Sequence, residues 1–179
     1  MAYHGLLWLG ELVIPDDQSK LQYQKLIPQR TVKFCTDSSL KGYQFQLPTH
    51  KADQHYYGST VLIQAHTPEI DPLLIFQKYI QQHDSLFPSI LVLWVWKNRL
   101  SPSWLWFLHR LWCFFPPNIS GHSFWARGAT RLASVGVAEE QIQALGHWSS
   151  DTWKAYIWKN PVVITSRALG HSSIFRDHP

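Results

Sequence analysis

The sequence predicts an α+β fold that is mainly α-helical and contains a small three-stranded antiparallel β-sheet. Three runs rich in β-branched and aromatic residues, at 31–36, 42–47 and 59–64, are separated by turn-like segments. From residue 71 onward, the apolar residues recur at helical spacing instead. A chain of 179 residues with 45% hydrophobic and 16% charged residues is long enough and apolar enough to bury one core.

The N-terminal half is expected to hold one helix followed by the three strands. Residues 3–13 have apolar residues at helical and near-continuous spacing, which favours a helix. Apolar residues alternate in 42–47 and 59–64, as is typical of strands with one buried face. The segment between them, 48–58, is polar and turn-like. This arrangement places Lys51 near the tip of a β-hairpin.

The C-terminal half is expected to be helical up to residue 161 and irregular over 162–179. The helices are predicted from Asp71, over Trp104–Phe115, from Gly121 to just before Gly136, over Ala138–Leu145, and from a cap at Ser150 or Asp151 through Ile157. Two prolines stop the second of these helices, and Gly146 follows the fourth at the usual C-cap position.

Composition excludes several classes of protein. The two cysteines, Cys35 and Cys113, lie far apart and form no CxxC pair, so neither a disulfide framework nor a cysteine zinc site is expected. No cluster of acidic residues suggests a metal site, and no small-molecule cofactor is expected. The apolar runs are too short to span a membrane. A net charge of +4 is compatible with a polyanionic partner.

One ordered set of polar residues carries the functional signal. Lys51 stands in the predicted hairpin, and His122 follows at the start of a predicted helix. His147 lies in the sequence ALGHWSS, and Tyr156 comes nine positions later on the next predicted helix. Any one of these residues is more often structural than catalytic. Their joint order is what points to a common site.

This order resembles the catalytic domain of the tyrosine recombinases, the phage integrase family, and especially those of fungal mobile elements. The segment 121–161 is similar to the family's His-x-x-Arg helix, its Leu-Gly-His turn and the helix that carries the nucleophilic tyrosine. The sequence GLLWLGEL, at 5–12, resembles the first-arginine helix, and LPTHKAD, at 47–53, resembles the hairpin that carries the lysine. The resemblance implies a catalytic domain over 3–161, with the family's N-terminal core-binding domain absent.

The resemblance also implies a role for each polar residue. Tyr156 would attack the scissile DNA phosphate and form a 3′-phosphotyrosyl link. Lys51 would protonate the leaving 5′-oxygen, and His122 would assist proton transfer. His147 would hydrogen-bond a non-bridging oxygen. The implied partner is DNA, bound through its phosphate backbone. No metal or cofactor is implied, a homo-oligomer assembled on DNA is allowed, and the implied localisation is the nucleus.

The sequence departs from the family at both arginine positions, which hold Trp8 and Trp125. A neutral indole offers one N–H donor and no charge, whereas an arginine grips phosphate oxygens with a charged fork. Loss of one oxyanion donor costs about a hundred- to a thousandfold in rate, and loss of an arginine at a phosphoryl group about a thousandfold or more. Arg127 lies about 200° further round a helix from Trp125, so it is expected on the opposite face.

These departures leave three interpretations open. The chain is a DNA breaking–rejoining enzyme with impaired catalysis, an inactive mobile-element remnant with residual non-specific DNA binding, or a helical domain that binds a protein partner. Trp158 also occupies a position where the family tends to carry a basic residue. Tryptophan is one C-to-T transition away from an arginine codon. Three such changes suggest the hypothesis of a decaying mobile-element copy.

Overall fold

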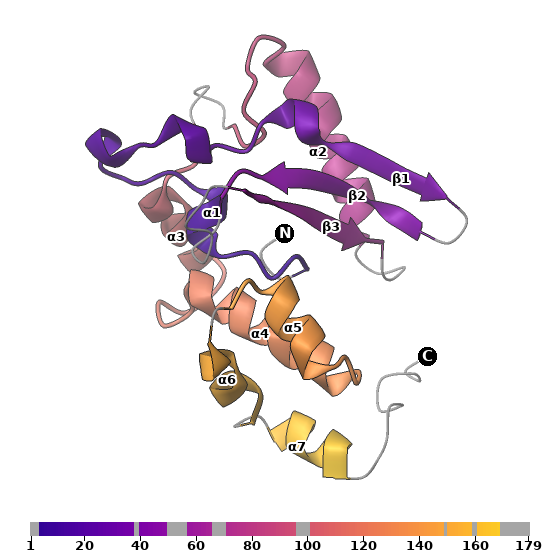
Figure 1. Ribbon diagram of the computed structural model, residues 1–179. Helices are drawn as coiled ribbons and strands as arrows, with labels where there is room; N and C mark the ends of the chain where they lie inside the picture. Colours follow the sequence, from indigo (N-terminus) through magenta and orange to yellow (C-terminus); the bar gives the residue numbers. More distant parts are fainter. Residues whose placement is uncertain are drawn as a thin grey trace.

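The computed structural model describes residues 4–37, 40–49, 57–65, 71–95, 101–148, 150–158 and 161–168. The three strands and α2 form one half of the molecule, and helices α4 to α7 form the other (Figure 1). The N-terminal segment, with α1 at Leu9–Leu12, runs between the two halves. The chain therefore has an α+β fold with a small sheet, as the sequence predicts.

The sheet is antiparallel in the order β1-β2-β3. Its strands are β1 (Lys33–Asp37), β2 (Leu40–Leu47) and β3 (Ser59–Gln64). The register places Leu47 opposite Ser59, so residues 48–58 connect β2 to β3. This confirms the predicted β-hairpin connection. Lys51 itself lies outside the described residues.

One face of the sheet packs against α2 (Pro72–Leu86), which begins at an Asp71 cap that accepts a hydrogen bond from the Leu73 N–H at 2.8 Å. The Tyr43 and Phe76 rings stack with centroids 4.0 Å apart. We call the buried residues around this contact the sheet cluster; they are Leu7, Ile27, Tyr43, Phe45, Leu47, Val61, Ile63, Phe76 and Leu93. Alternation along β2 and β3 supplies five of these nine residues, because every second side chain faces α2.

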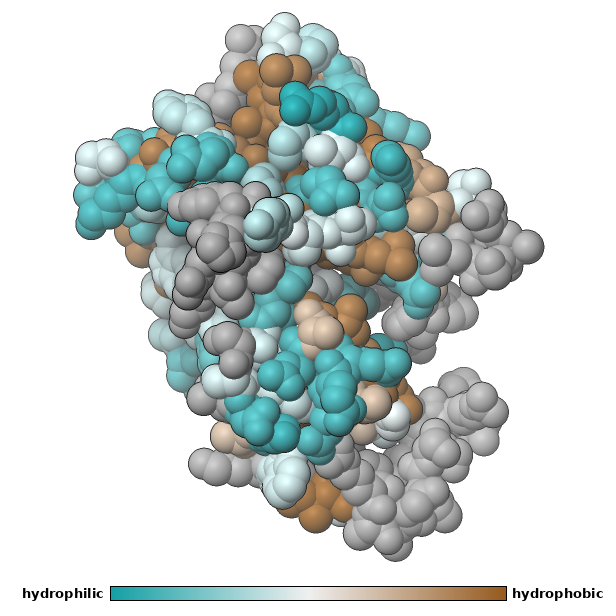
Figure 2. Space-filling model, in the orientation of Figure 1, coloured by the Kyte–Doolittle hydropathy of each residue, from teal (hydrophilic) through white to brown (hydrophobic). Residues whose placement is uncertain are grey.

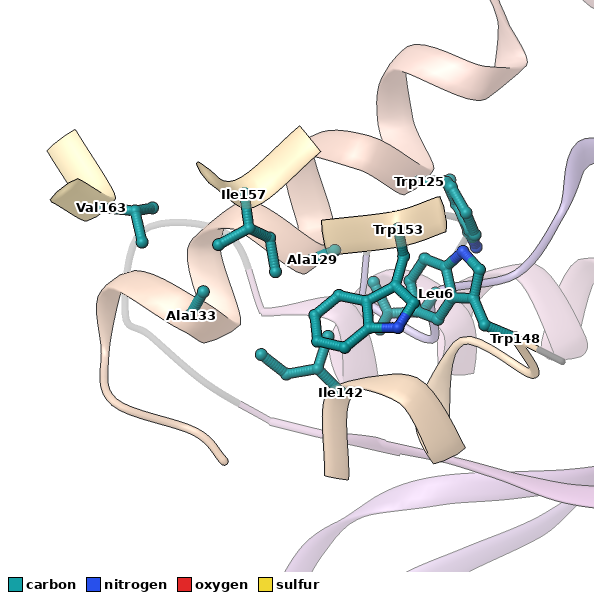
Figure 3. Close-up of a cluster of buried hydrophobic side chains, with 9 residues drawn as sticks. All are labelled: Leu6, Trp125, Ala129, Ala133, Ile142, Trp148, Trp153, Ile157 and Val163. Atoms are coloured by element: carbon teal, nitrogen blue, oxygen red, sulfur yellow. The ribbon is translucent and has the colours of Figure 1, made fainter. Parts of the chain in front are cut away.

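The helical half is built around α4 (Gly121–Ser134), which contacts α5 (Glu139–Leu145), α6 (Lys154–Trp158) and α7 (Pro161–Ala168). A 3₁₀ turn at Asp151–Trp153 precedes α6, and α3 (Trp104–Trp112) precedes α4. The helical cluster, drawn in Figure 3, consists of Leu6, Trp125, Ala129, Ala133, Ile142, Trp148, Trp153, Ile157 and Val163. Small residues on α4 allow the surrounding helices to approach it closely.

The predicted helix over 3–13 is largely wrong, because only Leu9–Leu12 are helical. Leu6 has a positive φ of 48°, and its side chain joins the helical cluster. The next residue, Leu7, joins the sheet cluster instead. An extended backbone sends successive side chains to opposite sides, which a helix does not do. The apolar run at the N-terminus therefore fills two cores rather than one helix face.

Three other segments differ from the sequence-based expectation. Short 3₁₀ turns at Gln18–Lys20, Tyr23–Lys25 and Gln29–Thr31 precede β1, so the first strand begins later than predicted. Helix α3 ends at Trp112, whose indole N–H donates to the Ile119 carbonyl at 3.0 Å. The tail expected to be irregular from residue 162 begins with α7, where Val163 is buried against the helical cluster. Residues 169–179 lie outside the described residues.

The surface of the helical half is mixed in character. On the face shown in Figure 2, hydrophilic residues predominate over α4 and α5, and an apolar patch lies near α7 at the lower end. Trp158 and Ile164, which line a shallow apolar pocket with Ile157 and Val163, are 59% and 53% exposed. The exposed position of Trp158 separates it from the buried tryptophans described below.

Candidate functional site

Helices α1 and α4 approach each other closely at the start of α4. A Cβ atom at Gly121 would lie 2.6 Å from both the Cβ and a Cδ atom of Leu9, so only glycine fits there without displacement. The Ser120 N–H donates to the Ser123 hydroxyl at 3.1 Å and helps to begin α4. This contact sets Trp8, which directly precedes α1, beside the first turn of α4. The predicted helix start at His122 is confirmed.

The two positions at which the resembling family carries arginine lie next to each other in the structure. The ring centroids of Trp8 and Trp125 are 4.4 Å apart, although the two residues lie far apart in the sequence. His122 lies 5.3 Å from Trp125 and 6.1 Å from Trp8 between ring centroids. The structure therefore brings together three of the residues that the sequence singles out. Figure 3 shows Trp125 next to Trp148, and their ring centroids are 3.9 Å apart.

The residues around Trp125 differ in how deeply they are buried. Trp125 is only 2% exposed, and Trp148 and Trp153 are 9% and 0% exposed. Trp8 is half-buried, whereas His122 is exposed. We call Trp8, Trp125, Trp148 and Trp153 the tryptophan cluster. It continues into the helical cluster as ordinary apolar packing, and Arg127 is exposed rather than buried with it, as predicted.

The chemistry available in this group follows from its side chains. Indoles provide single neutral donors, and the exposed imidazole of His122 can donate or accept a proton. The tryptophan cluster itself contributes no cation. It therefore cannot neutralise the charge that collects on the oxygens of a pentacoordinate phosphate.

His147 lies in a tight turn that follows α5. Gly146 ends that helix, as predicted, but the left-handed backbone conformation falls on His147, whose φ is 52°. Gly146 is required for a different reason, because a Cβ atom there would overlap the Trp148 ring, at 1.6 Å from its nearest atom. The His147 Nε2 atom lies 3.1 Å from the Ser59 hydroxyl at the start of β3. Sequence reasoning missed Ser59, since nothing local to β3 marks it.

Glu11 is a second residue that the sequence analysis missed. Its Oε2 atom accepts a hydrogen bond from the Trp8 N–H at 2.8 Å, while its buried Oε1 atom has no partner among the described residues. Burial raises the pKa of Glu11 to about 7, and the Trp8 hydrogen bond opposes this effect. Burial with few hydrogen-bond partners favours the neutral form of a carboxyl group. The spacing of Trp8 and Glu11 was the available signal.

The backbone of Tyr156 lies in α6, and its side chain lies outside the described part of the chain. The neighbouring residues Trp153 and Ile157 are fully buried and fix that helix against α4. Lys154 contacts Asp151 at 3.1 Å and Glu139 at 3.6 Å, which links α6 to α5. The predicted helix for Tyr156 is thus present.

No group of three or more metal-binding side chains occurs among the described residues. None of the helices in that same part of the chain has both the length and the apolar character needed to cross a membrane.

Comparison with known proteins supports the fold through one solved structure. No protein-family model matches the chain, and no curated protein matches it either. Among solved structures, the chain is similar to the Tn1549 transposon integrase in complex with transposon right end DNA, with a TM-score of 0.51 and 14% sequence identity. The match covers 94% of this chain and 55% of that one, so this chain spans about half the length of the integrase structure. At this identity, the likeness establishes that the chain has an integrase catalytic-domain-like fold.

Proposed function

We propose that the chain is the catalytic domain of a tyrosine recombinase that acts on DNA, and that its strand cleavage is severely impaired. The family assignment is supported by the shared fold and by the order of Lys51, His122, His147 and Tyr156 in the sequence. The observation that carries the impairment is the contact between Trp8 and Trp125 at 4.4 Å, with Trp125 buried. Both positions at which the family holds the phosphate with arginine are therefore apolar.

The proposed reaction uses the remaining residues in the roles that the resemblance implies. The Tyr156 hydroxyl attacks the phosphorus atom, Lys51 gives a proton to the departing 5′-oxygen, and the new phosphotyrosyl bond conserves the energy needed for rejoining. His122 moves a proton near the attacking oxygen, and His147 donates to a non-bridging oxygen. Without the arginines, the charge that develops on those oxygens lacks its main stabiliser. Binding to DNA survives more easily than cleavage.

The proposal extends to the origin of the chain. A fungal mobile element that has decayed would explain why Trp8, Trp125 and Trp158 all stand at positions where the family carries basic residues. Nuclear localisation and assembly on DNA as a homo-oligomer belong to the same proposal. TGG codons at the three positions, opposite CGG codons in intact relatives, are the expected nucleotide pattern. Unrelated codons there would contradict this history.

A suicide substrate, in which a nick lets the cleaved fragment leave, tests the proposal. The wild-type protein is expected to trap no covalent DNA adduct, whereas the double variant Trp8→Arg plus Trp125→Arg is expected to trap one. Tyr156→Phe in the double-variant background should abolish the adduct. Because Trp125 is buried, circular dichroism of each variant must accompany the assay. An adduct formed by the wild-type protein would contradict the impairment, and a folded double variant that neither cleaves nor binds DNA would contradict the family role.

A specific observation favours a second candidate, the helical domain that binds a protein partner. Leu105 on α3 and Phe114 and Phe115 just after it are 46%, 82% and 48% exposed. Exposed apolar side chains gathered on one segment often mark an interaction surface. If the folded double variant binds no DNA at low salt, while a Phe114→Ser variant of the chain becomes more soluble, this second function gains support.

A further inference from the structure

One hydrogen bond joins the sheet half to the turn that carries His147. The Ser59 hydroxyl and the His147 Nε2 atom are 3.1 Å apart, although 88 positions separate the two residues. Ser59 is the first residue of β3 and follows the connection that contains Lys51. Both side chains are half-buried. The contact therefore links two segments to which the proposed function assigns separate catalytic groups.

The turn around His147 is built so that the imidazole has little freedom. A φ of 52° is uncommon for a residue other than glycine, and the surrounding structure must hold it in place. The His147 N–H donates to the Ala144 carbonyl at 3.2 Å, and the Trp148 N–H donates to the Gln143 carbonyl at 3.2 Å. The Trp148 ring covers Gly146 from the other side. With its backbone fixed in this way, only the ring torsions of His147 remain to be set.

We propose that Ser59 is a positioning residue for His147, which it holds and orients for contact with a DNA phosphate. This inference rests on the proposed function, in which His147 donates to a non-bridging phosphate oxygen. The other ring nitrogen, Nδ1, is buried, so Nε2 is the nitrogen that must reach the phosphate. The Ser59 hydroxyl can accept from the Nε2–H or donate to Nε2, and an Nε2–H can be shared between this hydroxyl and a phosphate oxygen. A hydrogen bond to one ring nitrogen fixes the orientation and the tautomer of an imidazole. A ring that is already ordered loses less conformational freedom when DNA binds.

The test is a nuclear magnetic resonance experiment on protein with ¹⁵N-labelled histidine, without and with a nicked DNA duplex. Ser59→Ala is expected to shift the His147 ring nitrogen resonances and to weaken duplex affinity about two- to tenfold, the range for one lost hydrogen bond. Ser59→Thr keeps the hydroxyl and is expected to restore both readouts. Thr60→Ala is the matched control, because the Thr60 hydroxyl contacts Gln46 Nε2 at 2.7 Å instead, and it should change neither readout.

Two results would overturn the inference, and they are distinguishable. If Ser59→Ala leaves the His147 resonances of the DNA-free protein unchanged, Ser59 does not position the ring, whatever the protein does with DNA. If the duplex binds but the wild-type His147 resonances do not respond, the proposed role of His147 fails and the inference fails with it. If Ser59→Ala does not fold, Ser59→Thr is compared with Ser59→Val. These two variants have the same side-chain shape and differ in the presence of the hydroxyl group that contacts His147.

Discussion

The two halves of the molecule differ in whether their buried polar side chains are hydrogen-bonded. Beside the sheet cluster, the Tyr79 hydroxyl donates to the Leu93 carbonyl at 2.6 Å and accepts from the Val95 N–H at 3.0 Å. The buried His83 places its Nε2 atom 3.0 Å from the Val92 carbonyl. In the helical cluster, by contrast, the indole nitrogens of Trp148 and Trp153 are buried without a hydrogen-bond partner among the described residues. Trp94 packs at the edge of the sheet cluster. Among the described tryptophans of that half, only its indole nitrogen is likewise buried without a hydrogen-bond partner.

This difference separates a half whose buried tyrosine and histidine are hydrogen-bonded from a half that is packed mainly by large rings. Buried polar groups in folded proteins are nearly always paired, and the sheet half follows that rule through its tyrosine and histidine. The helical half instead accumulates large rings, including Trp125 at a position that the family resemblance assigns to arginine. Apolar burial stabilises the fold there but supplies no charge. The comparison therefore predicts strong packing effects in both halves, and the raised pKa of Glu11 predicts a pH dependence of stability near Trp8.

The largest expected effect comes from emptying either cluster. Phe45 and Trp153 are both fully buried, so Phe45→Ala and Trp153→Ala should each lower the free energy of unfolding by about 3–5 kcal/mol. Urea denaturation measures both values. Phe34→Ala on β1 is the control, since Phe34 is 40% exposed and should cost about 1 kcal/mol or less. A cost for Trp153→Ala no greater than the control would mean that the helical cluster does not stabilise the fold.

The next effect concerns the pH dependence near the site. The folded-state pKa of Glu11 is raised from 4.5 to about 7, so this group favours folding fully below pH 4.5, and the contribution is lost as the pH rises through 7. The shift corresponds to about 3 kcal/mol. The free energy of unfolding of the wild-type protein should therefore decline between pH 4.5 and 7, and Glu11→Gln should remove this decline. Urea denaturation at several pH values measures both profiles. An identical pH profile for Glu11→Gln and wild type would refute a raised pKa of Glu11 in the folded protein.

A smaller effect should follow from crowding the His147 turn. A methyl group added by Gly146→Ala must displace the Trp148 ring, which should lower the free energy of unfolding by about 1–3 kcal/mol. Gly10→Ala is the matched control, because no atom lies within 4 Å of the added Cβ and alanine favours helices. Thermal denaturation measures the stability of both variants, and tryptophan fluorescence reports whether the environment of Trp148 changes. Equal melting temperatures for both variants would show that Trp148 does not pack on Gly146.

The smallest effect tests the satisfied polar group of the sheet half. Tyr79→Phe removes a hydroxyl that makes two hydrogen bonds to the 93–95 segment, and should lower the free energy of unfolding by about 1–2 kcal/mol. Tyr23→Phe, at a side chain that is 76% exposed, should have no measurable effect. Urea denaturation distinguishes the two. If Tyr79→Phe were neutral, the contrast between the two halves would lose its basis.

The elements that the sequence predicted well are those with a clear local period. Strand β3 occupies 59–64 as expected, because its alternation matches burial on one face of the sheet. Helix α4 runs from Gly121 and ends before Gly136, as its spacing indicates. The helix expected at 3–13 failed because Leu6 and Leu7 belong to different clusters, and a local pattern cannot reveal two separate destinations.

The candidate site could be predicted only in part, for a similar reason. The positions of Trp8, His122 and Trp125 were readable from motif order, but their mutual contacts depend on α1 meeting α4 at Gly121. Ser59 was missed because its importance comes from a long-range contact with His147. Glu11 was missed because its importance comes from burial, which the sequence does not show. The roles of Lys51 and Tyr156 remain predictions from the family resemblance.

The central claim is that Trp8 and Trp125 stand where a DNA phosphate would otherwise meet two arginines. The most direct test is the salt dependence of duplex DNA affinity for wild type and for the double variant Trp8→Arg plus Trp125→Arg. Each added phosphate contact releases about 0.9 counterion, so the slope of log affinity against log salt should steepen by about 2 in the folded double variant. An unchanged slope in that variant would contradict the claim that these two positions face the DNA backbone.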